Sequence, residues 1–260
     1  MNTNYGFGGD EVREESTWRY AIGIVLATLI LCAIFLYIYV GPSVDEINGS
    51  VPSPTMSEDK VRFSVSGHPF EVRANYTVFP RERRGGSLGG MSLYALWPAM
   101  SGYSNAFKLE FIDNAADTRR INIEINQRRT AFTEVDRIET IYLPLTVDQR
   151  GTRTPYRLNR YTFRQERDTV PTNGYADTDL FIGQDSDGNT MALFCHDDDL
   201  ATIPSPECRR EYELNGDLTV TYRFKRPYLA EWKEIDTRVR TFLDDLSTTQ
   251  SRTSRNIKSR

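Results

Sequence analysis

The sequence contains few of the residues that most often carry out catalysis. Its 260 residues include only two histidines, His68 and His196. Neither stands beside a recognisable nucleophile, and the G-x-S-x-G motif of many serine hydrolases is missing. No pair of acidic residues stands out as suited to glycoside cleavage. We therefore predict a protein that is not an enzyme, and an enzyme is the least favoured of the three classes of function considered below.

Basic residues are not in excess either. The 32 lysines and arginines are outnumbered by 36 aspartates and glutamates, which gives a formal net charge of −4. Domains that bind nucleic acid usually carry a basic excess. We therefore expect no nucleic-acid partner.

One stretch, from Tyr20 to Val40, has no charged residue at all. At about 1.5 Å per helical residue, this run is long enough to cross a bilayer core of about 30 Å. Trp18, Tyr37 and Tyr39 lie near its ends, where aromatic rings favour the level of the lipid headgroups. The sequence therefore predicts a membrane-spanning helix in the lipid bilayer. A cleaved signal peptide is the alternative, which the length of the run and the lack of an A-x-A site disfavour.

The basic residues beside this helix predict its orientation. Arg13 and Arg19 lie on its amino-terminal side, and no basic residue follows it until Lys60. Because lysine and arginine are enriched on the cytoplasmic side of membranes, we expect residues 1–17 to form a cytoplasmic tail. The helix 18–40 would then anchor an extracytoplasmic domain, periplasmic if the membrane is a bacterial inner membrane.

The three cysteines fit this topology. Cys32 lies within the apolar run and counts as a small apolar residue. Cys195 and Cys208 are then the two cysteines of the extracytoplasmic part. In an oxidising compartment such a pair is expected to form a disulfide, which contributes about 3 kcal/mol for a loop of this size. Two free buried thiols are the alternative.

The rest of the chain divides by composition into three parts. Residues 41–58 are rich in proline and serine and have no apolar period, which predicts an extended linker. Residues 59–246 are predicted to form a β-rich domain. Residues 247–260 are polar and basic, and we expect a disordered tail.

Within the domain, apolar and polar residues alternate in short segments that are typical of strands. Asp185–Asn189 and Asn215-Gly216 have the composition of hairpin turns. Residues 133–140 could form a short helix or a loop. After Pro227 the apolar residues fall at helical spacing, which predicts an amphipathic helix up to residue 246. The expected strands lie at residues 61–65, 70–78, 91–97, 107–111, 121–125, 141–145, 156–163, 180–183, 191–195, 212–214 and 218–224.

These elements predict a mainly β protein. A single amino-terminal membrane helix would precede an antiparallel sandwich or barrel-like ectodomain with one carboxy-terminal amphipathic helix.

Two segments could bind a ligand. Residues 81–90 contain Arg81, Arg83 and Arg84 among glycines, which could contact an anion such as a lipid headgroup or a glycan. The segment lacks the G-K-[ST] ending of a phosphate-binding loop, so a flexible surface loop is the default interpretation.

The run Cys195–Asp199 combines a cysteine, a histidine and three aspartates, and a metal is conceivable there, calcium before zinc. An acidic loop after a disulfide cysteine is the favoured interpretation. Asp185–Asn189 resembles the start of an EF-hand loop, but its glycine is at the fourth place and His196 stands at the twelfth, so a turn is favoured. We predict no metal and no cofactor.

The preferred function is that of a membrane-anchored accessory or interaction protein. It would be a subunit or assembly partner of a larger complex, with other membrane proteins as partners. The alternative is a module that binds an anionic lipid or glycan of the envelope through the arginines of residues 81–84.

Overall fold

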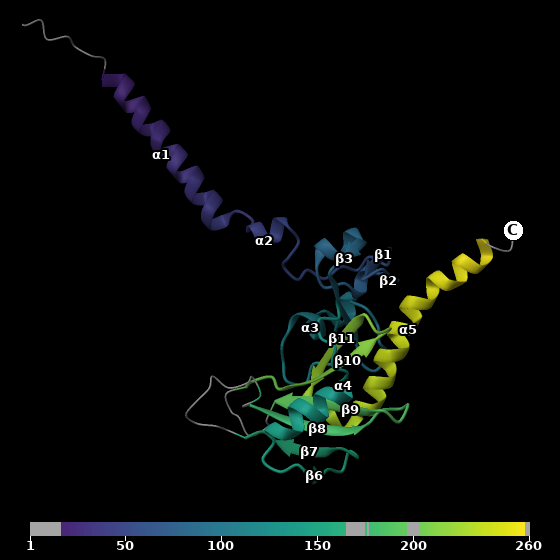
Figure 1. Ribbon diagram of the computed structural model, residues 1–260. Coiled ribbons are helices and arrows are strands. Elements are labelled where there is room, and N and C mark those ends of the chain that lie inside the picture. The colour runs from purple at the N-terminus through teal and green to yellow at the C-terminus, as the bar shows by residue number, and fades with distance from the viewer. Residues whose placement is uncertain (1–16, 165–174, 176, 197–202, 258–260) are drawn as a thin grey trace, which may run out of the picture. The chain divides into compact units, whose positions relative to one another are not determined.

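The computed structural model describes residues 17–164, 175, 177–196 and 203–257 (Figure 1). The chain divides into two compact units, one up to Asn48 and one from Gly49 onwards. Each unit is described by itself below.

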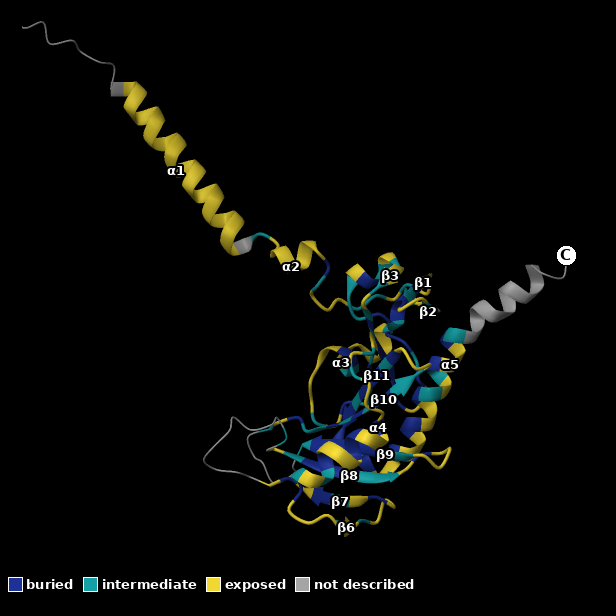
Figure 2. Cartoon of the chain, viewed as in Figure 1, coloured by how far each residue is buried: buried dark blue, intermediate teal, exposed yellow. Residues whose placement is uncertain are grey.

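The first unit contains the long apolar helix α1 (Thr17–Val40). Its residues from Trp18 to Tyr39 are exposed on every side, as the continuous yellow of Figure 2 shows. A helix buried in the core of a soluble protein would be covered instead. By length and composition this segment of 22 residues can cross a membrane, which agrees with the predicted span. The predicted tail 1–17 lies outside the described residues except for Thr17.

The predicted linker 41–58 is more structured than its composition suggested. The short helix α2 (Val44–Ile47) is capped by Ser43, whose hydroxyl accepts from the Glu46 amide while the Glu46 carboxylate accepts from the Ser43 amide. From Gly49 the chain belongs to the second unit, where the Gly49 carbonyl accepts from the Arg81 amide at 3.2 Å. Only residues 41–48 therefore connect the two units.

In the described part of the chain, eight strands form one antiparallel sheet in the order β4-β5-β11-β10-β9-β8-β7-β6. After β5 the order in the sheet is the reverse of the order along the chain, because β11 pairs with β5 and β6 lies at the far edge. The strands are β4 (Gly90–Leu96), β5 (Arg120–Gln127), β6 (Thr152–Arg153), β7 (Asn159–Thr162), β8 (Thr178–Gln184), β9 (Thr190–His196), β10 (Glu207–Leu214) and β11 (Leu218–Lys225).

Both predicted hairpins are present. At the turn between β8 and β9, the Asp185 carboxylate accepts from the amides of Asp187 and Asn189 at 3.0 and 2.9 Å. Between β10 and β11, three residues form the turn, and Asn215 and Gly216 in it have φ of 53° and 79°, left-handed values that asparagine and glycine adopt readily.

A second, smaller sheet has the order β2-β1-β3. Its strands are β1 (Lys60–Val65), β2 (His68–Arg73) and β3 (Gly86–Leu88). β1 pairs with β2 in antiparallel and with β3 in parallel orientation. The apolar residues of β1 and β2 belong to the same hydrophobic core as those of the large sheet.

Helix α5 (Trp232–Ile257) completes this core, preceded by a 3-10 turn at Arg226–Glu231. Trp232, Ile235, Val239 and Leu243 are at most 2% exposed and share the core with both sheets. The structure differs from the prediction at the far end, because the helix continues beyond residue 246 to Ile257 where a disordered tail was expected. Residues 247–257 lack proline and glycine, so nothing in the chain breaks the helix at the point where the apolar stripe ends.

A short helical segment covers the opposite face of the large sheet. It consists of α4 (Glu134–Arg137), a π turn at Ile138–Tyr142 and a 3-10 turn at Leu143–Leu145. Thr133 starts it with a capping box to Asp136. Ile138 and Tyr142 lie four residues apart and pack onto β8 and β9. The predicted strand at 141–145 was therefore wrong, because these residues bury one side of a helical turn.

The predicted strand at 107–111 was also wrong. This segment forms a 3-10 turn (Asn105–Phe107) and the helix α3 (Lys108–Ile112). Only Phe111 of its alternating residues is buried, whereas Phe107 is 43% and Leu109 68% exposed. β5 already pairs with β4 and β11, so the sheet has no open edge for a hairpin partner there.

The predicted fold class is confirmed. An amino-terminal apolar helix precedes a mainly β ectodomain with a large antiparallel sheet, a small sheet and a carboxy-terminal helix.

Candidate functional site

The predicted disulfide between Cys195 and Cys208 is present in the structure. The two residues lie directly opposite each other on β9 and β10, and both are fully buried. It joins the two strands where their pairing extends over only three residue pairs. The bond therefore holds the centre of the large sheet together.

The run Cys195–Asp199, which was considered as a metal site, is only partly described, because Asp197–Asp199 lie outside the described residues. The His196 ring accepts through Nδ1 from the Glu207 amide at 3.0 Å. In the part of the chain that the structure describes, no three or more cysteine, histidine or acidic side chains gather as metal ligands would. The absence of a metal stays a prediction.

The arginines of residues 81–84 are not on a flexible loop. They belong to a 3-10 helix (Pro80–Arg84), and Arg83 donates to both oxygens of Thr77 and to the Ser53 carbonyl. Arg81 donates to Ser50 at 3.2 Å. Two of the three arginines thus fasten residues 49–53 to the domain, and ligand contact at this segment stays a prediction.

Between these arginines, Glu82 is buried and accepts from the Ser92 amide of β4 at 3.1 Å. Burial raises the pKa of Glu82 to about 7, against the lowering effect of this hydrogen bond and of Arg81 and Arg83. The carboxyl group ties the 3-10 helix to the edge of the large sheet.

A buried cluster of charged side chains lies around Arg210 at the centre of the domain. Arg210 on β10 is 1% exposed and contacts Glu134, Asp185 and Asp236 at 2.9, 3.3 and 2.6 Å. The Tyr222 hydroxyl donates to Asp236 at 2.9 Å. These contacts join α4, the β8–β9 turn and α5 to the sheet, so we assign the cluster a structural role.

Sequence reasoning missed this cluster, although a signal existed. Cys208, Arg210 and Tyr212 alternate along β10, so Arg210 occupies a position on the buried face of the strand. An arginine at such a position requires buried acidic partners, which the three carboxylates supply.

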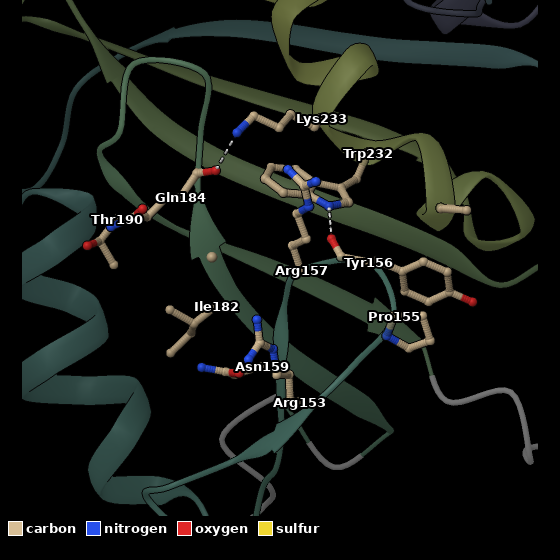
Figure 3. Close-up of a pocket in the computed structure, with 12 residues that line it drawn as sticks. Arg153, Pro155, Tyr156, Arg157, Asn159, Ile182, Gln184, Thr190, Trp232 and Lys233 are labelled. Carbon is tan, nitrogen blue, oxygen red and sulfur yellow. Dashed lines mark hydrogen bonds between the residues drawn. The ribbon is translucent and has the colours of Figure 1, made fainter.

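A hollow lies beside strands β6 to β9 of the large sheet, and Figure 3 shows the residues that line it. We call it the basic depression; its volume is about 890 Å³. Strands β6 to β9 contribute one side and the start of α5 the other. It is lined by Arg153, Pro155, Tyr156, Arg157, Asn159, Ile182, Gly183, Gln184, Thr190, Ala230, Trp232 and Lys233.

The wall of the basic depression is held in place by hydrogen bonds. Arg153 pairs with Asn159 in the β6–β7 register. The turn between these strands is closed by the Thr154 amide and hydroxyl, which both donate to the Leu158 carbonyl at 2.8 Å. Trp232 donates from Nε1 to the Tyr156 carbonyl at 3.0 Å, as Figure 3 shows. The turn is thereby fixed to the first residue of α5.

The charge of the basic depression has one sign. Arg153, Arg157 and Lys233 line it, and none of its described lining residues is acidic. The chain as a whole carries a formal net charge of −4. This part of the surface therefore favours an anionic ligand.

A second hollow of about 470 Å³ adjoins the first and shares Pro155, Tyr156 and Ala230 with it. We call it the proline-lined depression. Its other lining residues are Thr154, Arg160, Phe181, Pro206, Arg226, Pro227 and Leu229. Here the two arginines are held by the buried Asp179, with Arg160 at 2.9 Å and Arg226 at 3.5 Å. Apolar side chains and these paired arginines both line this depression.

Comparison with known proteins gives a likeness in fold. No family model and no curated protein matches the sequence. An immunity protein of the Stenotrophomonas maltophilia type IV secretion system matches with a TM-score of 0.51 and 17% identity, over 73% of this chain and 94% of that one. The iron-regulated outer membrane lipoprotein FrpD of Neisseria meningitidis matches with a TM-score of 0.46 and 12% identity, over 76% and 96%. At these identities the similarity concerns the fold alone.

Proposed function

We propose that the protein is a membrane-anchored interaction protein whose β-rich domain binds a protein partner through the basic depression. In this proposal α1 stays in the inner membrane with the amino terminus in the cytoplasm. The domain lies in the periplasm and contributes to a larger membrane assembly. The role is one of binding, without catalysis.

The observation that carries this proposal is the charge of the basic depression. Arg153 and Arg157 are exposed and form no ion pair among the described residues, and Lys233 lines the same depression. Arg119, Arg137 and Arg223, by contrast, are each paired with an acidic side chain. Cations that are gathered without counter-charges repel one another, which disfavours the free domain slightly. A partner with acidic groups would remove that repulsion.

The short connection between the units also supports a partner at the membrane. From Val40 to Gly49 the chain spans at most about 30 Å even if it is fully extended. In this proposal the connection tethers the first residue of the domain within that length of the end of α1, so a membrane protein is within its reach.

The fold likeness supports the same kind of role. The similar structure with the higher TM-score is named as an immunity protein of a secretion system. An immunity role acts on another protein, and we extend only the property of protein binding to this chain.

Site-specific crosslinking in native membranes tests the proposal. A photo-reactive residue at Thr190, which lines the basic depression, should give an adduct of defined mass with one protein. The same residue at Ser87, which is exposed on β3 of the small sheet, is the control. An absence of adducts at Thr190, or the same adducts at Ser87, would contradict the proposal.

A further inference from the structure

The two adjoining depressions differ in chemistry, and the difference defines the ligand. We infer that they bind one extended polypeptide segment in which acidic residues adjoin a large apolar side chain. The acidic residues contact the basic depression, and the apolar side chain enters the proline-lined depression. This inference rests on the proposed function and specifies the partner's chemistry.

The basic depression has cationic groups available for carboxylates. Arg153 and Arg157 are exposed and contact no acidic side chain in the described part of the chain. Lys233 makes one long hydrogen bond, 3.4 Å from Nζ to the Gln184 carbonyl, which leaves further ammonium donors for a ligand (Figure 3). Guanidinium groups bind carboxylates in a two-pronged geometry, which adds direction to the attraction of charge.

The backbone at Arg157 gives a second, independent observation. Its φ is 62°, in the left-handed region where glycine or asparagine is common and arginine is not. The conformation is unfavourable for a residue with a long side chain, and the hydrogen bond from Trp232 to the Tyr156 carbonyl holds the turn in place. Strained residues of this kind cluster at sites of function. We therefore infer that the Arg157 side chain contacts the ligand and is not needed to stabilise the fold.

The proline-lined depression places several apolar side chains next to these cations. Pro155, Pro206 and Pro227 line it together with Phe181 and Leu229, whose side chains are otherwise buried in the core. Its volume of about 470 Å³ can take a large apolar side chain. Tyr156 is 39% exposed and lies where the two depressions meet.

A polypeptide fits both depressions better than a phosphate-bearing lipid or glycan does. Asn159, Gln184 and Thr190 line the basic depression together with the cations. Their amide and hydroxyl groups can donate to and accept from the peptide groups of an extended segment. A lipid chain has no such groups, and a glycan phosphate has no large apolar side chain for the second depression.

Fluorescence anisotropy on the detergent-solubilised full chain tests the inference. The probe is a labelled peptide in which a run of glutamates is followed by one phenylalanine. The double variant Arg153→Gln/Arg157→Gln should bind it at least about tenfold more weakly than the unaltered protein. The matched control Lys108→Gln/Arg129→Gln removes the same charge from exposed basic residues outside both depressions and should change the affinity by less than about twofold.

The apolar half is tested separately. Replacing the phenylalanine of the probe by serine should weaken binding to the unaltered protein. The variant Ala230→Phe places a ring where the two depressions meet, and it should lose the preference for phenylalanine over serine. An unchanged circular dichroism spectrum and melting temperature show that each variant is folded.

Three results would overturn the inference. They are equal affinity of the peptide for the Arg153→Gln/Arg157→Gln variant, no preference for the phenylalanine, and tight binding of phosphatidylglycerol vesicles or polyphosphate without binding of the peptide. The crosslinking experiment tests the proposed function independently of these peptide results. An adduct at Thr190 supports protein binding at the basic depression even if the peptide does not bind.

Discussion

Arg210 and Arg157 belong to two arginine-containing regions of the same domain that differ in every physical respect. Arg210 is 1% exposed, contacts three carboxylates, and joins four elements of the fold. Arg157 is exposed, has no acidic partner among the described residues, and has a strained backbone. The contrast shows that arginine content alone does not identify a binding site. Burial and the acidic side chains around each guanidinium separate these two arginines.

The largest expected effect is on the buried side of this comparison. Arg210→Met leaves Glu134, Asp185 and Asp236 short of a buried counter-charge. Removing one partner of such a network costs about 3–5 kcal/mol of unfolding free energy. Urea unfolding of the solubilised protein, followed by tryptophan fluorescence, measures the loss.

The neighbouring residue on β10 provides the control for Arg210. Arg209 is partly exposed and lies 5.5 Å from the Phe194 ring centre. Arg209→Gln should cost less than about 1 kcal/mol, since exposed cation–aromatic contacts are weak. Equal losses for the two variants would remove the distinction between buried and surface arginines.

The disulfide gives a second measure of what the interior contributes. The double variant Cys195→Ala/Cys208→Ala should lose about 3 kcal/mol of unfolding free energy, because the unfolded chain is no longer restricted by the loop. Cys32→Ala in α1 is the matched control and should leave the domain unchanged. A loss below about 1 kcal/mol would show that the sheet holds β9 and β10 together without the bond.

A smaller effect of opposite sign is expected at the strained turn. Arg157→Gly relieves the left-handed conformation, so the unfolding free energy should stay the same or rise by up to about 1 kcal/mol. Binding of the acidic peptide should nevertheless weaken. A clear loss of stability in this variant would assign Arg157 to the fold and contradict the comparison.

The smallest effect on stability is expected when both arginines of the basic depression are replaced. Arg153→Gln/Arg157→Gln should change the unfolding free energy by less than about 0.5 kcal/mol, as surface substitutions away from packed features usually do. Chemical denaturation measures it. A large loss would mean that these residues support the β6–β7 turn instead of a ligand.

Much of the fold could be predicted from the sequence because its signals are local. The uncharged run at 20–40 predicts a helix by length, and Asn215-Gly216 predicts a hairpin by backbone preference. The cysteine pair followed from the predicted compartment, and the structure places Cys195 opposite Cys208. In each case the evidence lies within one short segment or in the number of cysteines outside the membrane helix.

The errors arose where tertiary contacts override a local pattern. Phe107, Leu109 and Phe111 alternate like a strand, yet only Phe111 is buried, because the pairing positions beside β5 are occupied. Ile141 to Leu145 alternate as well, but the capped helix at Thr133 continues into them. Sheet order, which no single segment encodes, decided the first case, and the helix that continues from Thr133 decided the second.

The candidate site was beyond the reach of sequence reasoning for a related reason. Arg153 and Arg157 lie near Lys233 only because the β6–β7 turn is bonded to the start of α5. In the chain they are far from Lys233 and look like scattered surface charges. The clustered arginines at 81–84 drew the prediction instead, and two of them hold the chain after Gly49.

The most direct test of the account combines the membrane crosslink with the charge variants. A photo-reactive residue at Thr190 is introduced into the unaltered protein and into both double variants, and adducts are compared in native membranes. We expect Arg153→Gln/Arg157→Gln to abolish the adduct and the control Lys108→Gln/Arg129→Gln to retain it. An adduct of equal yield in all three proteins would contradict the claim that Arg153 and Arg157 of the basic depression recognise the partner.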